Sequence, residues 1–389
     1  MWFFRSPHVY FGEDALSHLA EVQGRRAFIV TDEVLLGLGF PQRVQAYLED
    51  AGISSTIFAA VEPQPSLQTV QRGAAAMLDY APDWVIGLGG GSCMDAARAM
   101  WILYERPDID PAAISPMELL GLRQKARLMC IPTTAGTGSE TGYAVVLTDT
   151  VEQRKLTLGS PEATADLALV DPAFTLHLPR QATADTGIDV LTHAIEGYTC
   201  QWANDFTDGP CLKAIDLVFR YLPRAVAQGA ADAEAREKMA NAAAIAGLAL
   251  GNSNVALAHA LGHSAGALFH DLPHGRITAL FLPYTIEFVA PVGTARYQEI
   301  AHMLRLPAAG EAEGAASLAE AVRRLMQEVG LPLCLRDAGI SPDQFAANLQ
   351  PMCERADTDT NILMSRRLPE TEEVQRLFEY AYDGRSIDF

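Results

Sequence analysis

The sequence is poor in basic residues, with 29 Lys plus Arg against 48 Asp plus Glu and a formal net charge of -19 when His is counted as neutral. The averaged field of such a chain repels phosphate backbones and anionic lipid surfaces. Its longest small-apolar run, 242–251, is about half the ~20 residues that a membrane-spanning helix needs. We therefore expect neither nucleic acid nor a membrane as a partner.

Two other features are missing. Residues 1–7 show no basic segment followed by an apolar core, so we expect no secretory signal and a cytoplasmic location. The six cysteines form no C-x-x-C pair, which argues against a disulfide framework and a thiolate zinc cluster. We expect them to be buried or half-buried thiols.

The chain has 389 residues, of which 49% are hydrophobic and 20% charged, and this indicates a globular protein of two domains or one large one. Its first part alternates buried-strand patterns with helical patterns, which predicts βαβ units and a mostly parallel sheet covered on both faces. After 179 the pattern becomes helical, with a surface loop expected over 308–316. The predicted domains are an α/β domain over 1–179 and an all-α domain over 180–389. The expected strands are 27–31, 55–58, 84–88 and 128–131; the expected helices include 67–80, 93–104, 182–200, 234–250, 256–269 and 315–329.

Two glycine loops follow predicted strands. In the first, Gly89, Gly90, Gly91 and Ser92 lead into a helix, where a tight backbone and unpaired N–H groups suit a pyrophosphate. A plain strand-to-helix turn has the same pattern, and the match to G-x-G-x-x-G is partial. The second loop, 132–140, combines hydroxyls with glycines and gains weight only through its pairing with the first.

Asp32 ends the strand predicted at 27–31. A carboxylate there can bind adenosine ribose hydroxyls and repels a 2′-phosphate, which favours NAD over NADP. The alternative is an ordinary turn or cap residue.

The residues for a metal site come from two segments. Asp189 and His193 are four apart on one helical face, a pair that is more often a surface contact than a ligand pair. His259, His263, His270 and His274 fall within sixteen residues, and the first three share one helical face before Pro273. So many imidazoles are poor core residues, because each needs its own partner. One carboxylate and three imidazoles would hold iron(II), zinc, cobalt or manganese at a net charge of about +1, with room for one more ligand.

With these motifs in view, the sequence resembles the iron-containing, group III alcohol dehydrogenases over nearly its whole length. The resemblance lies in four segments that occur in the family's order: 87–95, 132–140, 189–196, and 259–263 leading to 273–275. It implies a Rossmann-like, NAD-binding N-terminal domain, a helical C-terminal domain, and a metal site at the cleft between them.

The resemblance also assigns residues. It implies the metal ligands Asp189, His193, His259 and His274, and it makes His263 a proton relay; His270 is taken as a local helix residue. The cofactor residues that it implies are Asp32, Gly89, Gly90, Gly91, Ser92, Asp95, Thr133, Thr134, Thr137, Ser139 and Lys155, the last just before a strand.

Three departures from the family pattern stand near these positions. Arg98 replaces the usual Lys, Gln64 replaces Asn in a Pro-Asn-Pro segment, and the spacing from His263 to His274 is one residue longer, with Asp271 as the extra residue.

We predict an NAD-dependent, iron-type dehydrogenase that moves hydride between a small primary alcohol or its aldehyde and the nicotinamide, as a homodimer by analogy with the family. A glycerol-dehydrogenase-like or dehydroquinate-synthase-like metalloenzyme is an alternative, which the fourth protein ligand disfavours. A non-catalytic nucleotide- or metal-binding protein with the same fold is another.

Overall fold

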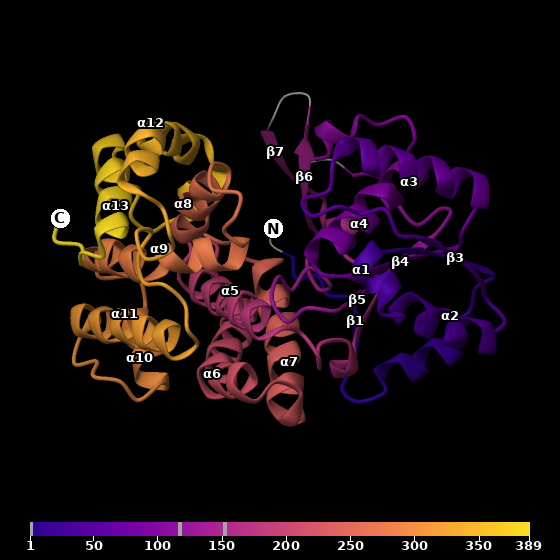
Figure 1. Ribbon diagram of the computed structural model, residues 1–389, viewed down its shortest axis with the longest axis horizontal. Helices are drawn as coiled ribbons and strands as arrows, with labels where there is room; N and C mark the ends of the chain where they lie inside the picture. Colours follow the sequence, from indigo (N-terminus) through magenta and orange to yellow (C-terminus); the bar gives the residue numbers. More distant parts are fainter. Residues whose placement is uncertain (1–2, 116–118, 151–153) are drawn as a thin grey trace. The chain divides into compact units, whose positions relative to one another are not determined.

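The computed structural model describes residues 3–115, 119–150 and 154–389 (Figure 1). The chain divides into two compact units, Met1–His177 and Leu178–Phe389. The division falls after His177, whereas the sequence pattern placed it after 179.

The first unit is built on a six-stranded parallel sheet in the order β1-β8-β5-β4-β2-β3. The four strands expected from the sequence are confirmed as β2, β3, β4 and β5, and β1 and β8 were not expected. Their bounds are β1 His8–Phe11, β2 Arg26–Val30, β3 Ser54–Phe58, β4 Trp84–Gly89, β5 Arg127–Pro132 and β8 Leu167–Val170.

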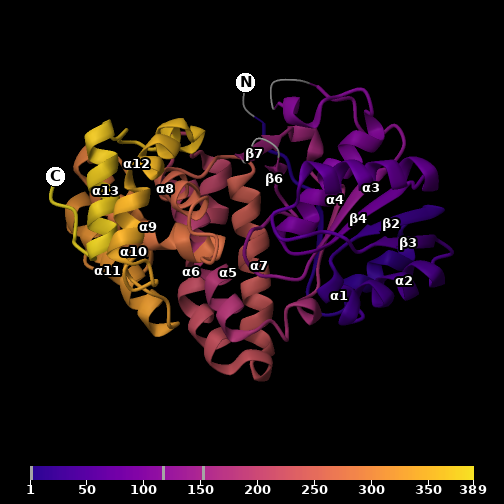
Figure 2. The ribbon, with the colours of Figure 1, turned by 45° about the horizontal axis from the view of Figure 1, so that its top comes forward.

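Helices cover both faces of this sheet, as the sequence predicted. Alternate residues of β2 point to opposite sides: Phe28 and Val30 join one buried cluster, and Ala27 and Ile29 join the other. In Figure 2, α3 (Leu67–Tyr80) and α4 (Gly91–Glu105) lie on one side of the strands, and α1 (Glu33–Gly37) and α2 (Phe40–Asp50) lie on the other. The remaining elements are η1 Ala15–Glu21, η2 Pro111–Ala113, η3 Pro161–Ala163, η4 Pro172–Phe174 and an antiparallel hairpin of β6 Ala144–Asp149 with β7 Arg154–Gly159.

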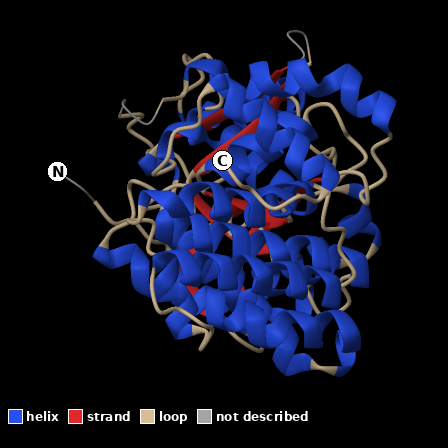
Figure 3. Cartoon of the chain, turned by 90° about the vertical axis from the view of Figure 1, so that its left-hand side faces the viewer, coloured by secondary structure: helices blue, strands red, loops and turns tan. Residues whose placement is uncertain are grey.

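The second unit, all of which is described, contains helices and no strand. Figure 3 shows the helices of the chain in blue and the strands in red. Two expectations were wrong here. The helix expected over 256–269 ends at Gly266, and the loop expected over 308–316 gives way to a helix that starts at Glu311. The helices are α5 Arg180–Thr199, α6 Asp205–Gln228, α7 Ala233–Leu250, α8 Leu257–Gly266, α9 His274–Val289, α10 Tyr297–Met303, α11 Glu311–Glu328, α12 Pro342–Thr358 and α13 Thr371–Asp383, with η5 Gly229–Ala231, η6 Ala290–Val292 and η7 Thr360–Met364.

Among the described residues, no single helix is long and apolar enough to cross a membrane. One pair of helices, His274–Val292 with Tyr297–Met303, meets that test of length and composition only when taken together, and it is bent by 120°.

Candidate cofactor and metal sites

The strand order places the two glycine loops and Asp32 side by side in the first unit. The chain runs from β2 to β3 on one side of β2 and then returns to β4 on its other side, so the order reverses between β2 and β4. Ligands of open α/β sheets bind at the carboxyl ends of strands at such a point. Asp32 follows β2, Gly90 follows β4, and Thr133 follows the next strand, β5.

The two glycine loops touch, and a side chain at Gly91 would collide with the second loop. A Cβ on Gly91 would lie 2.9 Å from Cγ2 of Thr137, and one on Gly90 would lie 3.4 Å from Cγ2 of Thr134. Gly89 has φ +153°, and its Cβ would lie 2.6 Å from Cβ of Cys93. The second loop therefore packs against the N-terminus of α4, whose backbone N–H groups are of the kind that bind phosphate.

The predicted acidic residues of this site have defined partners. Asp32 is the N-cap of α1: its Oδ1 accepts the Leu35 N–H at 2.8 Å, and its Oδ2 lies 3.4 Å from Cys93 Sγ. Asp95 accepts Ser139 Oγ–H at 2.7 Å and the Val146 N–H at 3.0 Å. Asp32 can cap α1 and still contact a ribose, because the two roles are compatible. Asp95 links α4 to the second loop and to β6.

Arg98, the departure from the family's Lys, is fully buried under the second loop. Its guanidinium donates to the carbonyl oxygens of Ser139 at 2.6 Å, Ala144 at 3.0 Å, Gly142 at 3.3 Å and Ala163 at 2.9 Å. A lysine has three donors and no planar fork, so it could not make the same set of bonds. The substitution therefore anchors the loop rather than simply conserving a charge.

Lys155 belongs to β7 instead of preceding it. Its side chain lies outside the described residues, so its expected role stays a prediction.

In the second unit, three helices bring the predicted metal ligands together. Helix α5 carries Asp189 and His193, α8 carries His259, and α9 begins with His274. One potential ligand atom from each of the four lies within 4.8 Å of the others. Oδ1 of Asp189 is 3.9 Å from Nε2 of His193, 3.8 Å from Nε2 of His259 and 4.0 Å from Nε2 of His274.

These distances fit a metal ion better than direct pairing. They are too long for hydrogen bonds, but ligands at ~2.0–2.2 Å from one ion are themselves ~3 to 4.4 Å apart. Nε2 of His259, one of the atoms of this cluster, is buried without a hydrogen-bond partner, a state that is costly unless another group satisfies it. Imidazole and carboxylate together suit iron(II), zinc, cobalt and manganese.

Burial differs around the cluster. The side chains of Asp189, His193 and His259 are 2 to 5% exposed, and that of His274 is 42% exposed. The His274 side is thus where a small molecule can reach the ligands.

The ionisation states in this cluster suit a cation. Burial opposes the charge of Asp189, but His193, His274 and His259 outweigh it, so the pKa of this carboxyl lies below its usual value. Burial, and then repulsion from His193, hold the pKa of His259 well below that of free histidine. The cluster is therefore one carboxylate with a neutral imidazole at His259, the form that binds metal.

Glu196 is a residue of the site that the sequence analysis did not single out. Its Oε2 lies 2.5 Å from Nδ1 of His259, and its Oε1 accepts the Ala258 N–H at 2.6 Å. Burial raises the pKa of this carboxyl to about 7, against the backbone hydrogen bonds that lower it. A partner on Nδ1 turns Nε2 of His259 toward the ligand cluster. Its position three residues after His193 on α5 was the signal available in the sequence.

His263 and His270 have different surroundings. Nδ1 of His263 lies 2.8 Å from Oδ2 of Asp359, and the ring stacks on that of His274 with centroids 5.3 Å apart. His270 is exposed on the turn after α8. The expectation that it shares a helical face with His259 was wrong, because the helix ends four residues before it.

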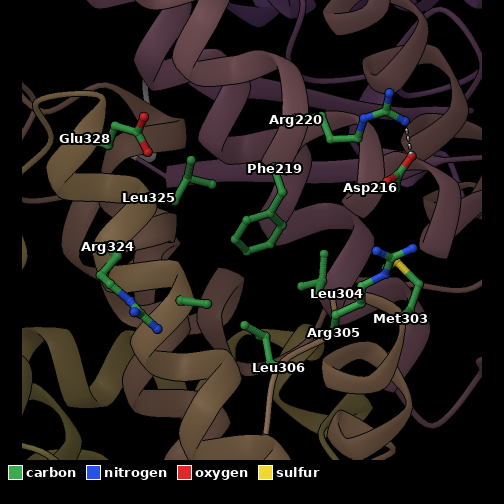
Figure 4. Close-up of a pocket in the computed structure, with 11 residues that line it drawn as sticks. Asp216, Phe219, Arg220, Met303, Leu304, Arg305, Leu306, Arg324, Leu325 and Glu328 are labelled. Atoms are coloured by element: carbon green, nitrogen blue, oxygen red, sulfur yellow. Dashed lines mark hydrogen bonds and ion pairs between the residues drawn. The ribbon is translucent and has the colours of Figure 1, made fainter.

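A separate cavity of about 660 Å³ lies in the same unit, between α6, α11 and the segment after α10 (Figure 4). Phe219, Leu304 and Leu325 give it an apolar lining, and Arg220 and Arg324 lie at its edge. None of the described residues that line it belongs to the predicted metal or cofactor sets.

Comparison with known proteins gives one family match in each of the two units. Residues 6–172 match the family model for iron-containing alcohol dehydrogenase, and residues 183–382 match the model for the C-terminal part of the Fe-containing alcohol dehydrogenase family. The chain belongs to the iron-containing alcohol dehydrogenase family.

Individual relatives differ in length and in name. An aldehyde-alcohol dehydrogenase of Streptococcus pneumoniae is 38% identical over 98% of this chain but only 46% of its own length. The chain thus spans about half the length of the first curated relatives that it matches. An NADPH-dependent butanol dehydrogenase of Clostridium saccharobutylicum is 36% identical over 98% of both chains. The solved structure of an iron-containing alcohol dehydrogenase from Thermococcus thioreducens superposes with a TM-score of 0.89 and 31% identity, over 99% of this chain and 100% of that one.

Proposed function

We propose that the protein is a metal-dependent oxidoreductase that transfers hydride between a small primary alcohol or aldehyde and NAD(H). The observation that carries this proposal is the cluster in which three imidazole Nε2 atoms surround one carboxylate oxygen at 3.8 to 4.0 Å. A divalent ion held by Asp189, His193, His259 and His274 supplies Lewis acidity toward the alcohol or aldehyde oxygen when bound. With four protein ligands, the cluster favours this family's alcohol chemistry over a glycerol-dehydrogenase-like or dehydroquinate-synthase-like site.

On the cofactor side, we propose that the α4 N-terminus binds the pyrophosphate and that Asp32 binds the adenosine ribose. The open backbone at Gly90 and Gly91 and the position of Asp32 at the β2 end support this. Ser92, Thr133, Thr134 and Thr137 would supply further hydroxyls, with Asp95 and Ser139 holding the loops together. The chain's own Asp32 favours NAD, although one relative is named for NADPH.

The decisive experiment adds iron(II) or zinc, NAD and a panel of primary alcohols to the anaerobically purified chain, and follows reduced cofactor by absorbance. We expect metal-dependent reduction with at least one alcohol and the reverse reaction with its aldehyde. Bound metal and NAD without turnover of any alcohol or aldehyde would instead support a non-catalytic binding protein.

We also propose that the chain forms a homodimer through the edge strand β1. This strand pairs with β8 on one side, and Phe11 is 67% exposed on it, a combination that favours pairing with another strand. Light scattering should give twice the chain mass; a monomer at micromolar concentration would contradict the proposal.

We propose a cytoplasmic location because the cysteines of the protein are free thiols. The six cysteines are all free and buried, which suits a reducing compartment. Fractionation of expressing cells checks this, and recovery outside the cytoplasmic fraction would overturn it.

A further inference from the structure

Asp359 is held in one position between two helical elements. It follows the last residue of α12 and is the N-cap of η7, where its Oδ1 accepts the Asn361 N–H at 2.9 Å. Its own backbone N–H donates to the carbonyl oxygens of Arg355 and Ala356 at 3.1 and 3.2 Å. The side chain is 16% exposed. Backbone on both sides thus fixes the rotamer of this carboxylate.

The second oxygen of Asp359 is directed at His263. Oδ2 lies 2.8 Å from Nδ1 of the imidazole, across 96 residues of sequence. An ionised carboxylate can only accept hydrogen bonds, so the proton of the pair is on Nδ1. Nε2 of His263 then carries a lone pair.

That lone pair belongs to a ring at the edge of the ligand cluster. The His263 ring stacks on His274 at 5.3 Å between centroids and meets His259 edge-on at 5.7 Å. His263 is nevertheless outside the set of four ligands, and within the described chain no hydrogen bond engages its Nε2. The ring is 24% exposed. Nε2 of His263 is therefore accessible beside the proposed position of the substrate oxygen.

We propose that Asp359 is a positioning residue that holds His263 as the Nδ1–H tautomer, so that Nε2 accepts the hydroxyl proton of the alcohol. The inference rests on the proposed function. In the oxidation, the O–H proton passes to Nε2, the C–H bond breaks with its electron pair going to NAD⁺ as hydride, and the products are aldehyde, NADH and an imidazolium paired with Asp359. The proton later leaves to water. Aldehyde reduction runs through the same steps in reverse.

The test is Asp359→Asn in the metal-loaded protein. Asn can still cap η7 through its oxygen, which leaves its NH₂ group facing Nδ1. Nδ1 must then accept, and the His263 proton moves to Nε2, where it blocks proton uptake. We expect kcat to fall at least about 100-fold, as a misplaced tautomer does in other Asp–His pairs, with KM and metal content close to wild type. The matched control is Asp110→Asn, which removes the charge from another N-cap that accepts a backbone N–H at 2.9 Å and should leave kcat unchanged.

A second readout separates this proposal from the function itself. In zinc-loaded protein labelled with ¹⁵N-histidine, the His263 signals, assigned by their loss in His263→Ala, should show Nδ1–H in the wild type and Nε2–H in Asp359→Asn. An unchanged tautomer, or a kcat within threefold of wild type, would overturn the positioning role while leaving the dehydrogenase proposal intact. If the wild type turns over no alcohol or aldehyde, the proposed function fails, and the NMR comparison still decides the tautomer.

Discussion

Replacing His274 by alanine is expected to strip the metal from the protein and to remove most of its turnover. His274 is the first residue of α9, and its Nε2 is one of three imidazole nitrogens about the Asp189 oxygen. Loss of groups that merely orient a ligand costs about 10- to 100-fold in metal affinity, so a lost ligand should cost at least about 100-fold. We expect kcat/KM to fall about 1,000-fold, since a Lewis acid contributes several kcal/mol. Metal analysis and steady-state kinetics measure both.

His270→Ala is the control, because it removes an imidazole four residues away that lies exposed on the turn after α8. Metal content and turnover should stay at wild-type levels. The reverse pattern, with His270→Ala losing metal and His274→Ala retaining it, would refute the ligand set and require the turn to refold around the ion.

Asp32→Asn is expected to lower the preference for NAD over NADP by about 100-fold in kcat/KM. Hydrogen bonds to a charged group contribute about 1.5–3 kcal/mol, so their loss weakens binding of the NAD ribose. The same change removes repulsion of the 2′-phosphate of NADP. Because Asn and Asp are similar N-caps, α1 should keep the bond that Leu35 N–H now donates to Asp32. Parallel kinetics with the two cofactors give the ratio.

The matched control for this variant is Glu33→Gln, which removes a charge from the next residue, exposed in the first turn of the same helix. Its cofactor ratio should not change. A ratio that shifts equally in both variants would show a general field effect of the acidic surface, and Asp32 would then have no special contact with the ribose.

The sequence predicted those parts of the fold whose signals are local. β2, β4 and β5 are buried on both faces and therefore form continuous apolar runs, and α3 was predicted with its observed bounds, Leu67–Tyr80. β1 escaped notice because it is a short, mostly exposed edge strand. β8 is Leu-Ala-Leu-Val, four residues whose composition suits a helix equally well. Only its pairing with β1 and β5 makes it a strand.

The candidate metal site was accessible to sequence reasoning because helical spacing and a run of histidines mark it. The end of α8 could not be predicted from the sequence, and this boundary decides which histidines can meet Asp189. Asp359 carried no signal at all: it is 96 residues from His263, and only the packing of the α12–η7 junction against α8 brings them together. Residues that act through tertiary contacts of this kind cannot be identified from spacing.

The buried guanidinium of Arg98 bears on the entropy of coenzyme binding. By fixing the carbonyls of Ser139, Gly142 and Ala144 in advance, it leaves residues 139–144, which follow the proposed cofactor residue Thr137, with little backbone freedom. Ordering a free loop costs about 1–2 kcal/mol per residue, a cost that would otherwise be subtracted from affinity. In the proposed cofactor site, less of that cost would therefore oppose the contacts of the second loop with a nucleotide.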